Sequence, residues 1–333
     1  TLNCNFACPY CYEGDLTYGK KQMTAETADH VISWIKARAL ESRVSRIRVE
    51  YLGGEPLLNL PVIEKIGSEL IPFCDENRMK FMSLAISNGY LLARDTAERL
   101  VAAGVSSVRV TIDGPEDVHN SSRFLRGNGG ETYKTIIKNL QGCKDILSLS
   151  LSGCFTKKTV ERVPDLLDDL IKAGLGPDDI YRVQFAPVLP SDTGGTAAAF
   201  DKRCIPASDT HEITIKANAE LIKRGFGTYA DDLKISPCPA VCSGDYTINY
   251  DGVLYKCPCI IDHPGHEVGN VRDEMSYNAE MIRCLGFSTF ENDKCRNCSV
   301  LPFCLGGCRY MAMVKNGKFH SLDCEKEGME AIV

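Results

Sequence analysis

The sequence of 333 residues has no long apolar run and no excess of positive charge. Its hydrophobic stretches are too short to cross a bilayer, and no signal peptide is visible. A formal net charge of -6 gives no general attraction to nucleic acid or to an anionic membrane, although a local basic groove stays open. We therefore expect a cytoplasmic protein that binds neither nucleic acid nor membranes.

Cysteine is the residue in excess, with 17 in the chain. Disulfide frameworks are typical of small secreted domains that lack a hydrophobic core. This chain is long enough for one large domain and a smaller one, and an odd number of thiols leaves at least one unpaired. Metal ligation in a reducing compartment is therefore the better interpretation.

Strands and helices alternate through the first two thirds of the chain. Apolar and β-branched segments predict strands at 46–52, 80–87, 105–112, 147–155 and 181–188. Amphipathic segments predict helices at 24–41, 61–77, 95–103, 131–141 and 159–173. Thr24 and Asp95 are the expected N-caps of the first and third helices. This alternation indicates an α/β fold of parallel strands with helical crossovers, in a barrel or an open sheet.

The density of cysteines changes near residues 226–237, where periodicity is also weak. We expect a first domain at 1–230 and a second, cysteine-rich domain at 231–333. The first cysteines lead directly into the predicted helix at 24–41, so a strand should precede them. We expect that strand to lie upstream of residue 1.

Cys4, Cys8 and Cys11 stand in the segment CNFACPYC with the spacing C-x3-C-x2-C. Three thiolates can bind three irons of a [4Fe–4S] cluster and leave the fourth iron open to an exogenous ligand. A structural zinc site would need a fourth protein ligand, and none is nearby. With Tyr10 before its last cysteine, the segment resembles the signature of the radical S-adenosylmethionine (SAM) enzymes.

This resemblance implies a partial (β/α)6 TIM-type barrel. It also implies that SAM chelates the open iron and that an electron from the cluster cleaves SAM to methionine and a 5′-deoxyadenosyl radical. Tyr10 is then expected near the adenine, the alternative being a loop aromatic that only packs. YLGGEP (51–56) resembles the family's GGEP motif, whose expected contacts to the SAM ammonium group are Gly53, Gly54 and Glu55.

Two later strand ends also match the family. ISNG (86–89) resembles the ribose-contacting segment, with Ser87 and Asn88 as candidates, although turn chemistry alone also explains it. TIDGPEDVHNSSR (111–123) resembles a motif of the peptide-modifying branch, with Thr111 in place of the usual serine. Asp113 and Arg123 are expected at the ribose or the SAM carboxylate, and a surface ion pair is the alternative for Arg123.

Seven cysteines near the end of the chain follow the pattern C-x9-G-x4-C, then C-x2-C-x5-C-x3-C, then a final cysteine. The pattern resembles the SPASM domain, which holds two auxiliary [4Fe–4S] clusters, so three clusters are expected in all. By position, the ligands of the first auxiliary cluster are Cys242, Cys257 and Cys308. Those of the second are Cys295, Cys298, Cys304 and Cys324.

The first auxiliary cluster lacks one ligand in this assignment. Cys238 is the preferred fourth ligand and Cys259 the second choice, because Pro258 stiffens the link between Cys259 and Cys257. If neither binds, the open iron is free for a substrate thiolate. The isolated cysteines are expected to be small buried residues; these are Cys74, Cys143, Cys154, Cys204 and Cys284.

Radical SAM enzymes with such a tail act mostly on peptides or proteins. In sulfatase maturases, which form formylglycine, an aspartate base follows the cysteine that corresponds to Cys257; here Pro258 stands there and cannot accept a proton. We therefore favour a maturase of ribosomally made peptides that forms a thioether or another cross-link. Anaerobic sulfatase maturation is the second reading, and an iron–sulfur carrier or scaffold is the non-enzyme alternative.

The resemblance also implies partners. These are a peptide substrate, a flavodoxin- or ferredoxin-type electron donor and, in some family members, a separate leader-binding protein. No catalytic base is assigned from the sequence. The loop IIDHPGHEVGN (260–270) offers an acid or base near the first auxiliary cluster, or is a polar loop; its candidates are Asp262, His263, His266 and Glu267.

Overall fold

The computed structural model describes residues 1–17, 19, 21–188, 210–227, 237–274, 277–324 and 326–330. The chain divides into two compact units, Thr1–Asp232 and Leu233–Val333. Cys204 lies outside the described residues. Among the helices described, none is long and apolar enough to cross a membrane.

The first unit is built on a parallel sheet of five strands in the order β1-β2-β3-β4-β5. The strands are β1 (Arg46–Tyr51), β2 (Lys80–Ser87), β3 (Val105–Thr111), β4 (Ser148–Phe155) and β5 (Ile180–Pro187). Because each strand runs parallel to the next, all five carboxyl ends meet at one edge of the sheet. The predicted α/β partial barrel is confirmed; the strand expected before residue 1 stays a prediction.

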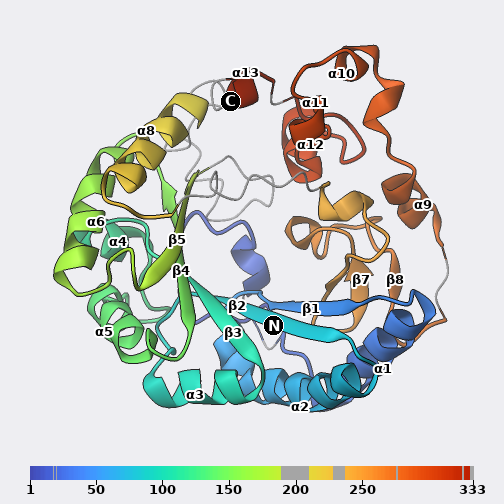
Figure 1. Cartoon of the computed structure of the whole chain (residues 1–333), viewed down its shortest axis with the longest axis horizontal. Helices are drawn as coiled ribbons and strands as arrows, with labels where there is room; N and C mark the ends of the chain where they lie inside the picture. Colours follow the sequence, from blue (N-terminus) through green and yellow to red (C-terminus); the bar gives the residue numbers. More distant parts are fainter. Residues whose placement is uncertain are drawn as a thin grey trace. The chain divides into compact units, whose positions relative to one another are not determined.

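Helices follow the outer side of the arc of strands (Figure 1). These helices are α1 (Ala25–Glu41), α2 (Leu60–Glu76), α3 (Arg94–Ala102), α4 (Glu116–Ser122), α5 (Tyr133–Cys143), α6 (Val163–Lys172) and α8 (Thr210–Lys223). The unit also contains the 3₁₀ turns η1 (Gly14–Thr17), η2 (Pro56–Asn59) and η3 (Val160–Arg162). Thr24 caps α1 as expected, since its side chain accepts from the Thr27 N–H. The prediction of Asp95 as the N-cap of α3 is wrong, because the N-cap is Ala93. Asp95 lies in the first turn of α3, where its negative charge still interacts favourably with the helix dipole.

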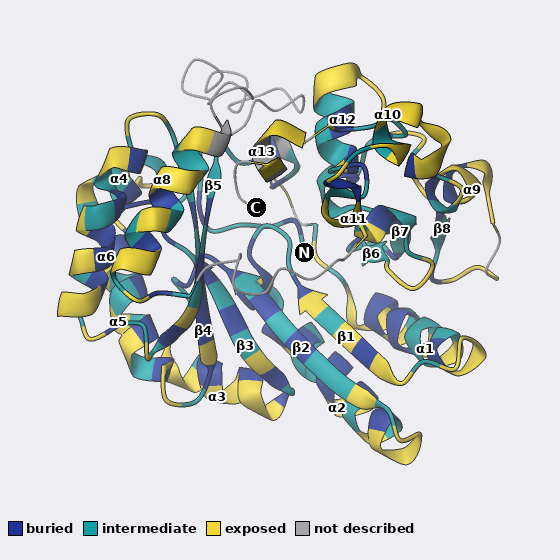
Figure 2. Ribbon diagram, turned by 45° about the horizontal axis from the view of Figure 1, so that its top comes forward, coloured by how far each residue is buried: buried dark blue, intermediate teal, exposed yellow. Residues whose placement is uncertain are grey.

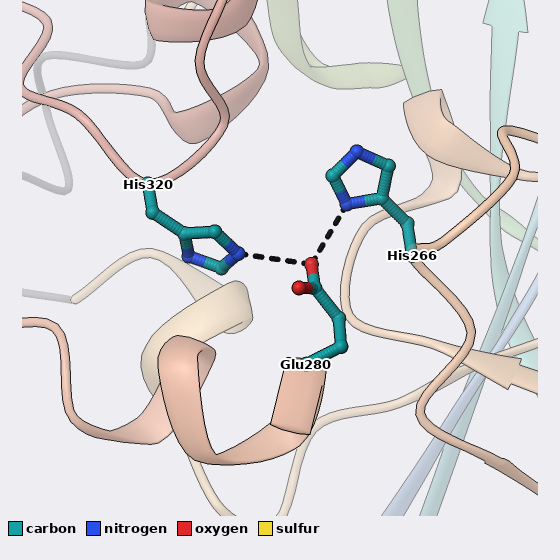
Figure 3. A group of neighbouring side chains, drawn as sticks. All are labelled: His266, Glu280 and His320. Carbon is teal, nitrogen blue, oxygen red and sulfur yellow. Dashed lines mark hydrogen bonds and ion pairs between the residues drawn. The ribbon is translucent and has the colours of Figure 1, made fainter. Parts of the chain in front are cut away.

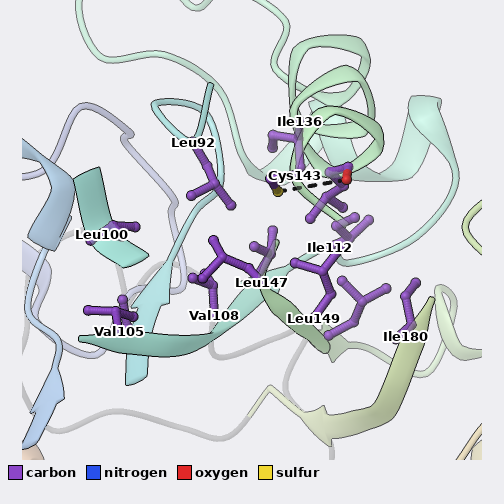
Figure 4. Close-up of a cluster of buried hydrophobic side chains, with 14 of the residues drawn as sticks. Leu92, Leu100, Val105, Val108, Ile112, Ile136, Cys143, Leu147, Leu149 and Ile180 are labelled. Atoms are coloured by element: carbon purple, nitrogen blue, oxygen red, sulfur yellow. Dashed lines mark hydrogen bonds between the residues drawn. The ribbon is translucent and has the colours of Figure 1, made fainter. Parts of the chain in front are cut away.

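The core of this unit lies between the sheet and the helices, and Figure 4 shows its central part. Val108 of β3, Leu149 of β4, Leu100 of α3 and Ile136 of α5 are all fully buried. Burying each such side chain contributes about 1.5–3 kcal/mol. Figure 2 shows the buried positions along the strands and on the inner faces of the helices. The carboxyl edge of the sheet therefore rests on a large apolar core.

The second unit has much shorter elements. An antiparallel sheet contains β6 (Thr247–Ile248), β7 (Val253–Tyr255) and β8 (Gly269–Asn270). Its helices are α9 (Ala279–Leu285), α10 (Asp293–Arg296), α11 (Leu301–Cys304), α12 (Arg309–Asn316) and α13 (Lys326–Glu330), with 3₁₀ turns η7 (Pro239–Val241), η8 (Pro258–Ile260) and η9 (Thr289–Glu291). The longest of these elements, α12, has 8 residues.

Candidate active site

The loop of the first three cysteines lies at the carboxyl edge of the sheet and is held there by backbone contacts. The Ala7 N–H donates to the Phe124 carbonyl at 3.1 Å, and the Arg126 N–H donates to the Asn5 carbonyl at 2.8 Å. Phe6 forms an antiparallel bridge with Leu125, and its side chain is 2% exposed. The loop is thus held by the buried side chain of Phe6 and by its hydrogen bonds to the segment after α4.

Arg126 fastens this loop from the side. Its guanidinium donates to the carbonyls of Cys4 at 3.1 Å and Phe6 at 2.9 Å, and to the Thr17 hydroxyl at 2.8 Å. Hydrogen bonds from a charged donor are about twice as strong as neutral ones. Arg126 was not predicted as a site residue, because its only signal in the sequence is that it is a second arginine three residues after Arg123.

Burial raises the pKa of all three thiols of this loop. It raises the pKa of Cys4 to about 12 and that of Cys11 to about 11. Burial also raises the pKa of Cys8, against the opposing charge of Arg123. Thiolates at these positions therefore need a strong positive charge beside them, which the irons of a cluster supply.

The spacing of the thiols does not suit a single zinc ion. Tetrahedral Zn–S bonds of about 2.3 Å put the sulfurs about 3.8 Å apart. Among the described residues, no three cysteine sulfurs all lie within 4.8 Å of one another. Ligands that each bind a different iron of one cluster lie farther apart, so the loop fits a cluster better than a mononuclear site.

Glu55, the acid of the GGEP segment, joins the ends of β1 and β2. Its carboxylate accepts from the Leu57 N–H at 3.0 Å, the Ser87 hydroxyl at 2.8 Å and the Asn88 N–H at 2.7 Å. Burial raises the pKa of this fully buried carboxyl, against the opposing effect of these hydrogen bonds. Glu55 thus has a structural role in addition to the SAM contact expected of it.

Gly53 and Gly54 make room for the chain itself. Gly53 has φ +136°, and a Cβ placed there would meet the Thr1 carbonyl oxygen at 1.8 Å. A Cβ at Gly54 would lie 2.4 Å from the Asn3 carbonyl oxygen. The sequence predicts that this glycine pair lets a ligand approach the backbone closely. In the structure, residues 1–3 of the chain also need the space that the two glycines leave.

Asn88 connects the end of β2 to the cysteine loop. Its side-chain amide donates to the Asn5 side-chain oxygen at 2.7 Å and lies 4.0 Å from the Cys4 sulfur. The amide oxygen accepts from the Tyr90 N–H at 3.0 Å, and Gly89 between them has φ +78°. Two of the predicted SAM segments, the cysteine loop and ISNG, are therefore in direct contact.

Tyr10, Asp113 and Arg123 form one hydrogen-bonded group. The Tyr10 hydroxyl donates to Asp113 Oδ2, and Arg123 Nη1 donates to the Tyr10 oxygen at 2.8 Å. Arg123 Nε is buried without a hydrogen-bond partner among the described residues. This spare donor beside the cysteine loop suits an anionic ligand such as a carboxylate. Thr111 lies just before the group and hydrogen-bonds the Ser152 hydroxyl at 3.0 Å.

His119 supports this group from behind and was missed in the sequence. Its Nδ1 accepts from the Asp113 N–H at 3.4 Å, so Nε2 carries the proton and faces the Thr132 hydroxyl at 3.1 Å. That hydroxyl donates to the Arg123 carbonyl at 2.6 Å. Burial, with help from Arg123, lowers the pKa of His119 to about 3, so the ring stays neutral.

Of the isolated cysteines, Cys74, Cys143 and Cys284 are buried as expected. Cys154 was also expected to be buried, but it is only half-buried and lies at the end of β4, beside the site. Its N–H donates to Asp113 Oδ1 at 3.0 Å, and burial and the Asp113 charge raise the pKa of its thiol to about 12.

The cysteines of the second unit form two groups of electrostatic neighbours. Burial raises the pKa of Cys308, with contributions from Cys257 and Cys238. The Cys242 thiol lies 3.6 Å from the Cys238 carbonyl, and the neighbouring Cys259 raises the pKa of Cys257. In the other group, burial raises the pKa of Cys295, with contributions from its neighbours Cys304, Cys324 and Cys298.

Two buried cations stabilise the loops that carry these cysteines, and neither was selected from the sequence. Lys256, 1% exposed, donates to the Cys242 carbonyl at 2.5 Å and lies 4.5 Å from the centre of the Tyr246 ring. Arg309, also 1% exposed, donates to the Ser321 carbonyl at 2.5 Å and stacks 3.9 Å from the centre of the Phe287 ring. Backbone carbonyls near the cysteines are thus held by charged donors.

Solved structures share this fold over the whole chain. The structure titled native anSMEcpe with bound AdoMet and Cp18Cys peptide has a TM-score of 0.77 at 18% identity, covering 100% of this chain and 93% of that one. Streptococcus suis SuiB bound to S-adenosylmethionine has a TM-score of 0.66 at 18% identity, covering 97% and 74%. At these identities the likeness shows the fold, in the second unit as well as the first.

Curated relatives are similar over different lengths. A cysteine-type anaerobic sulfatase-maturating enzyme of Clostridium novyi is 22% identical over 332 residues, which cover 92% of this chain and 85% of that enzyme. The radical SAM cyclopropyl synthase TigE of Paramaledivibacter caminithermalis is 26% identical over 153 residues, 43% of this chain. The match spans only 31% of the synthase.

The family model of the Radical SAM superfamily matches residues 1–181, more than half of the chain. The match contains the cysteine loop, the GGEP segment and the Tyr10–Asp113–Arg123 group. It implies SAM and a [4Fe–4S] cluster as cofactors, and it confirms the resemblance seen in the first cysteine segment. The chain belongs to the radical SAM superfamily of enzymes.

Proposed function

We propose that the protein is a radical SAM peptide maturase that forms a thioether or another cross-link in a ribosomally made peptide. The bound cofactors supply a 5′-deoxyadenosyl radical, which abstracts a hydrogen from the peptide. Cys4, Cys8 and Cys11 would hold the [4Fe–4S] cluster. The structural neighbour with a bound peptide and the sulfatase-maturating relative support a peptide or protein as the substrate.

The residues around the cysteine loop position SAM in this proposal. The ammonium group faces the backbone of Gly53 and Gly54 and the carboxylate of Glu55. The SAM carboxylate takes Arg123 Nε, which is buried without a hydrogen-bond partner among the described residues. Tyr10 lies at the adenine, and the remaining contacts come from the strand ends; these are Ser87, Asn88, Thr111 and Asp113.

Two auxiliary [4Fe–4S] clusters complete the cofactors, which makes three in all. Cys238, Cys242, Cys257 and Cys308 bind the first, and the effect of Cys257 and Cys238 on the pKa of Cys308 supports three members of this set. Cys295, Cys298, Cys304 and Cys324 bind the second, in agreement with the neighbours of Cys295. A ferredoxin- or flavodoxin-type donor supplies electrons, and a separate protein is the proposed binder of a peptide leader.

Pro258 is the observation that carries cross-linking rather than formylglycine formation. It is the first residue of η8, directly after Cys257. Its ring nitrogen is part of the peptide bond and its side chain has no acid, so this position cannot take up a proton. A maturase that depends on an aspartate there would lack its base.

Sulfatase maturation is the second candidate, because a relative of that type matches 92% of the chain. The test is an anaerobic assay of the full, cluster-loaded chain with SAM, dithionite and a sulfatase-type Cys-x-Pro-x-Arg peptide. We expect no aldehyde in the mass spectrum of this peptide. A mass change that matches formylglycine would replace cross-linking by sulfatase maturation.

A positive test uses the peptide encoded beside the gene, co-expressed with the enzyme. Closing one thioether from a thiol and a C–H bond removes a pair of hydrogens from the peptide, and alkylation shows one thiol fewer. We expect both changes, and we expect neither when Cys4, Cys8 and Cys11 are replaced by alanine. An unmodified peptide together with SAM cleavage that no peptide stimulates would contradict a peptide maturase.

A further inference from the structure

Three polar side chains of the second unit meet in a group that contains no cysteine. His266 lies in the loop between η8 and β8, Glu280 lies in the first turn of α9, and His320 follows α12. Figure 3 shows both imidazole rings pointing at the same carboxylate. Only His266 belongs to a segment that the sequence analysis selected.

The distances within the group are short. His266 Nδ1 lies 2.7 Å from Glu280 Oε1, and His320 Nε2 lies 2.9 Å from the same oxygen. Among the described residues, this is the only group of three ligand-type side chains whose donor atoms all lie within 4.8 Å of one another. In a tetrahedral site with bonds of about 2.0–2.1 Å, the ligand atoms are about 3.4 Å apart. Small side-chain movements would therefore admit an ion.

The group is also arranged as metal ligands are. Glu280 is 5% exposed, and its second oxygen, Oε2, accepts from Arg283 at 3.0 Å, which leaves Oε1 for the imidazoles. Phe319, 3% exposed, packs edge to face against both rings, with centroids 5.3 Å from His266 and 5.2 Å from His320. Carboxylates that bind metals are themselves hydrogen-bonded, as Glu280 is, and an apolar shell such as Phe319 limits the access of water.

The charge of the group suits a cation. Glu280 supplies the carboxylate of the group, and both imidazoles and Arg283 hydrogen-bond to it. His320 Nδ1 is buried without a hydrogen-bond partner in the described part of the chain, and Nε2 is the ring nitrogen that faces Glu280.

We propose that His266 Nδ1, His320 Nε2 and Glu280 Oε1 bind one divalent transition-metal ion, separate from the iron–sulfur clusters. Two imidazoles and one carboxylate form a donor set that zinc and iron(II) both use. Three protein ligands leave a coordination position for water. The ion joins the loop after η8, the start of α9 and the segment that leads to Cys324, and so stabilises a unit with little regular structure.

Zinc is the probe for this site. The full chain, loaded with its clusters so that their cysteines are occupied, is incubated anaerobically with Zn²⁺ and passed through a desalting column. Zinc per chain is then measured by mass spectrometry, and its ligands by zinc-edge X-ray absorption. We expect about one zinc per chain with nitrogen and oxygen at about 2.0–2.1 Å and no sulfur at about 2.3 Å.

The variant His266→Gln/His320→Gln should lose this zinc, and His263→Gln, from the same loop, should keep it. Unchanged iron content and circular dichroism show that a variant is folded. Glu280→Gln is a second variant, which keeps the size of the side chain and removes its charge. Sulfur in the zinc shell, zinc retained by the folded double variant, or no zinc in the wild type would overturn the proposal. None of these readouts depends on SAM cleavage or on a peptide.

Discussion

The two units hold their cysteines in different ways. In the first, the loop of Cys4, Cys8 and Cys11 is attached by hydrogen bonds to a five-stranded sheet with a large core. In the second, the cysteines lie on turns and on helices of at most 8 residues, and Cys324 is exposed. The first site is formed by packing on a large core, whereas the second depends on short elements and on hydrogen bonds from Lys256 and Arg309.

This difference has an energetic consequence. Small units bury too little apolar surface to be very stable and often depend on a metal. A preformed site, by contrast, keeps its shape when the metal leaves. We infer that iron is added to an existing fold in the first unit and maintains the fold in the second, so changes at the two sites should have different effects.

The largest expected effect comes from replacing Cys4, Cys8 and Cys11 together by alanine. This variant should produce no 5′-deoxyadenosine, while its iron content falls only from about twelve to about eight per chain. Because the sheet does not depend on the cluster, far-ultraviolet circular dichroism should stay unchanged. SAM cleavage by the triple variant under dithionite would show that the cluster assignment is wrong. If the wild type contained zinc in place of iron, or only about four irons per chain, the assignment of two auxiliary clusters would be wrong.

A single ligand of the second unit should have a more local effect. We expect Cys238→Ala to change the electron paramagnetic resonance signal of the auxiliary clusters and to impair peptide modification, while SAM cleavage persists. Cys259→Ala is the matched control and should leave the signal unchanged. Each of the two thiols lies near a proposed ligand, since Cys238 raises the pKa of Cys308 and Cys259 raises that of Cys257. The reverse pattern would make Cys259 the ligand, and no change in either variant would leave that iron open for substrate.

In the first unit, Glu55→Gln tests the preformed site. The amide group of glutamine would bring an N–H against one of the donors that now face the carboxylate. Leaving one buried donor unsatisfied costs about 1–3 kcal/mol of unfolding free energy, measurable by anaerobic urea denaturation. Glu64→Gln, which breaks the exposed ion pair with Arg99, is the control and should cost less than about 1 kcal/mol. Equal losses would mean that Glu55 has no special structural role.

The strands of the first unit were predictable because each is a short apolar run with clear ends. All five predicted strands lie within one residue of the observed ends, and Thr24 caps α1. Asp95 was misplaced by two positions, since Asp is favoured both as a cap and in the first turn. The short helix α4 was not predicted, because no apolar periodicity marks it.

The contacts that shape the site were not predictable in the same way. Arg126 binds carbonyls more than a hundred residues earlier in the chain, and His119 acts through Asp113 and Thr132. His266, Glu280 and His320 come from three separate segments. The glycines of the GGEP segment were recognised, but their contact with Thr1 and Asn3 depends on the tertiary fold. Local patterns define elements and ligand types, whereas these contacts depend on which strand ends become neighbours.

The smallest effect we predict is the dependence of the first unit on pH through His119. Its pKa is about 3 in the folded protein and about 6.5 when unfolded, so the unfolded chain binds more protons between these values. The stabilisation is therefore complete above about pH 6.5 and is lost as the pH falls toward 3. Between pH 7.5 and 6 the loss is about 0.8 kcal/mol. His119→Asn can still accept from the Asp113 N–H but cannot take up this proton, so its unfolding free energy should change less over the same range. Equal pH dependence of the two proteins in urea denaturation would show that His119 is not held neutral by the fold.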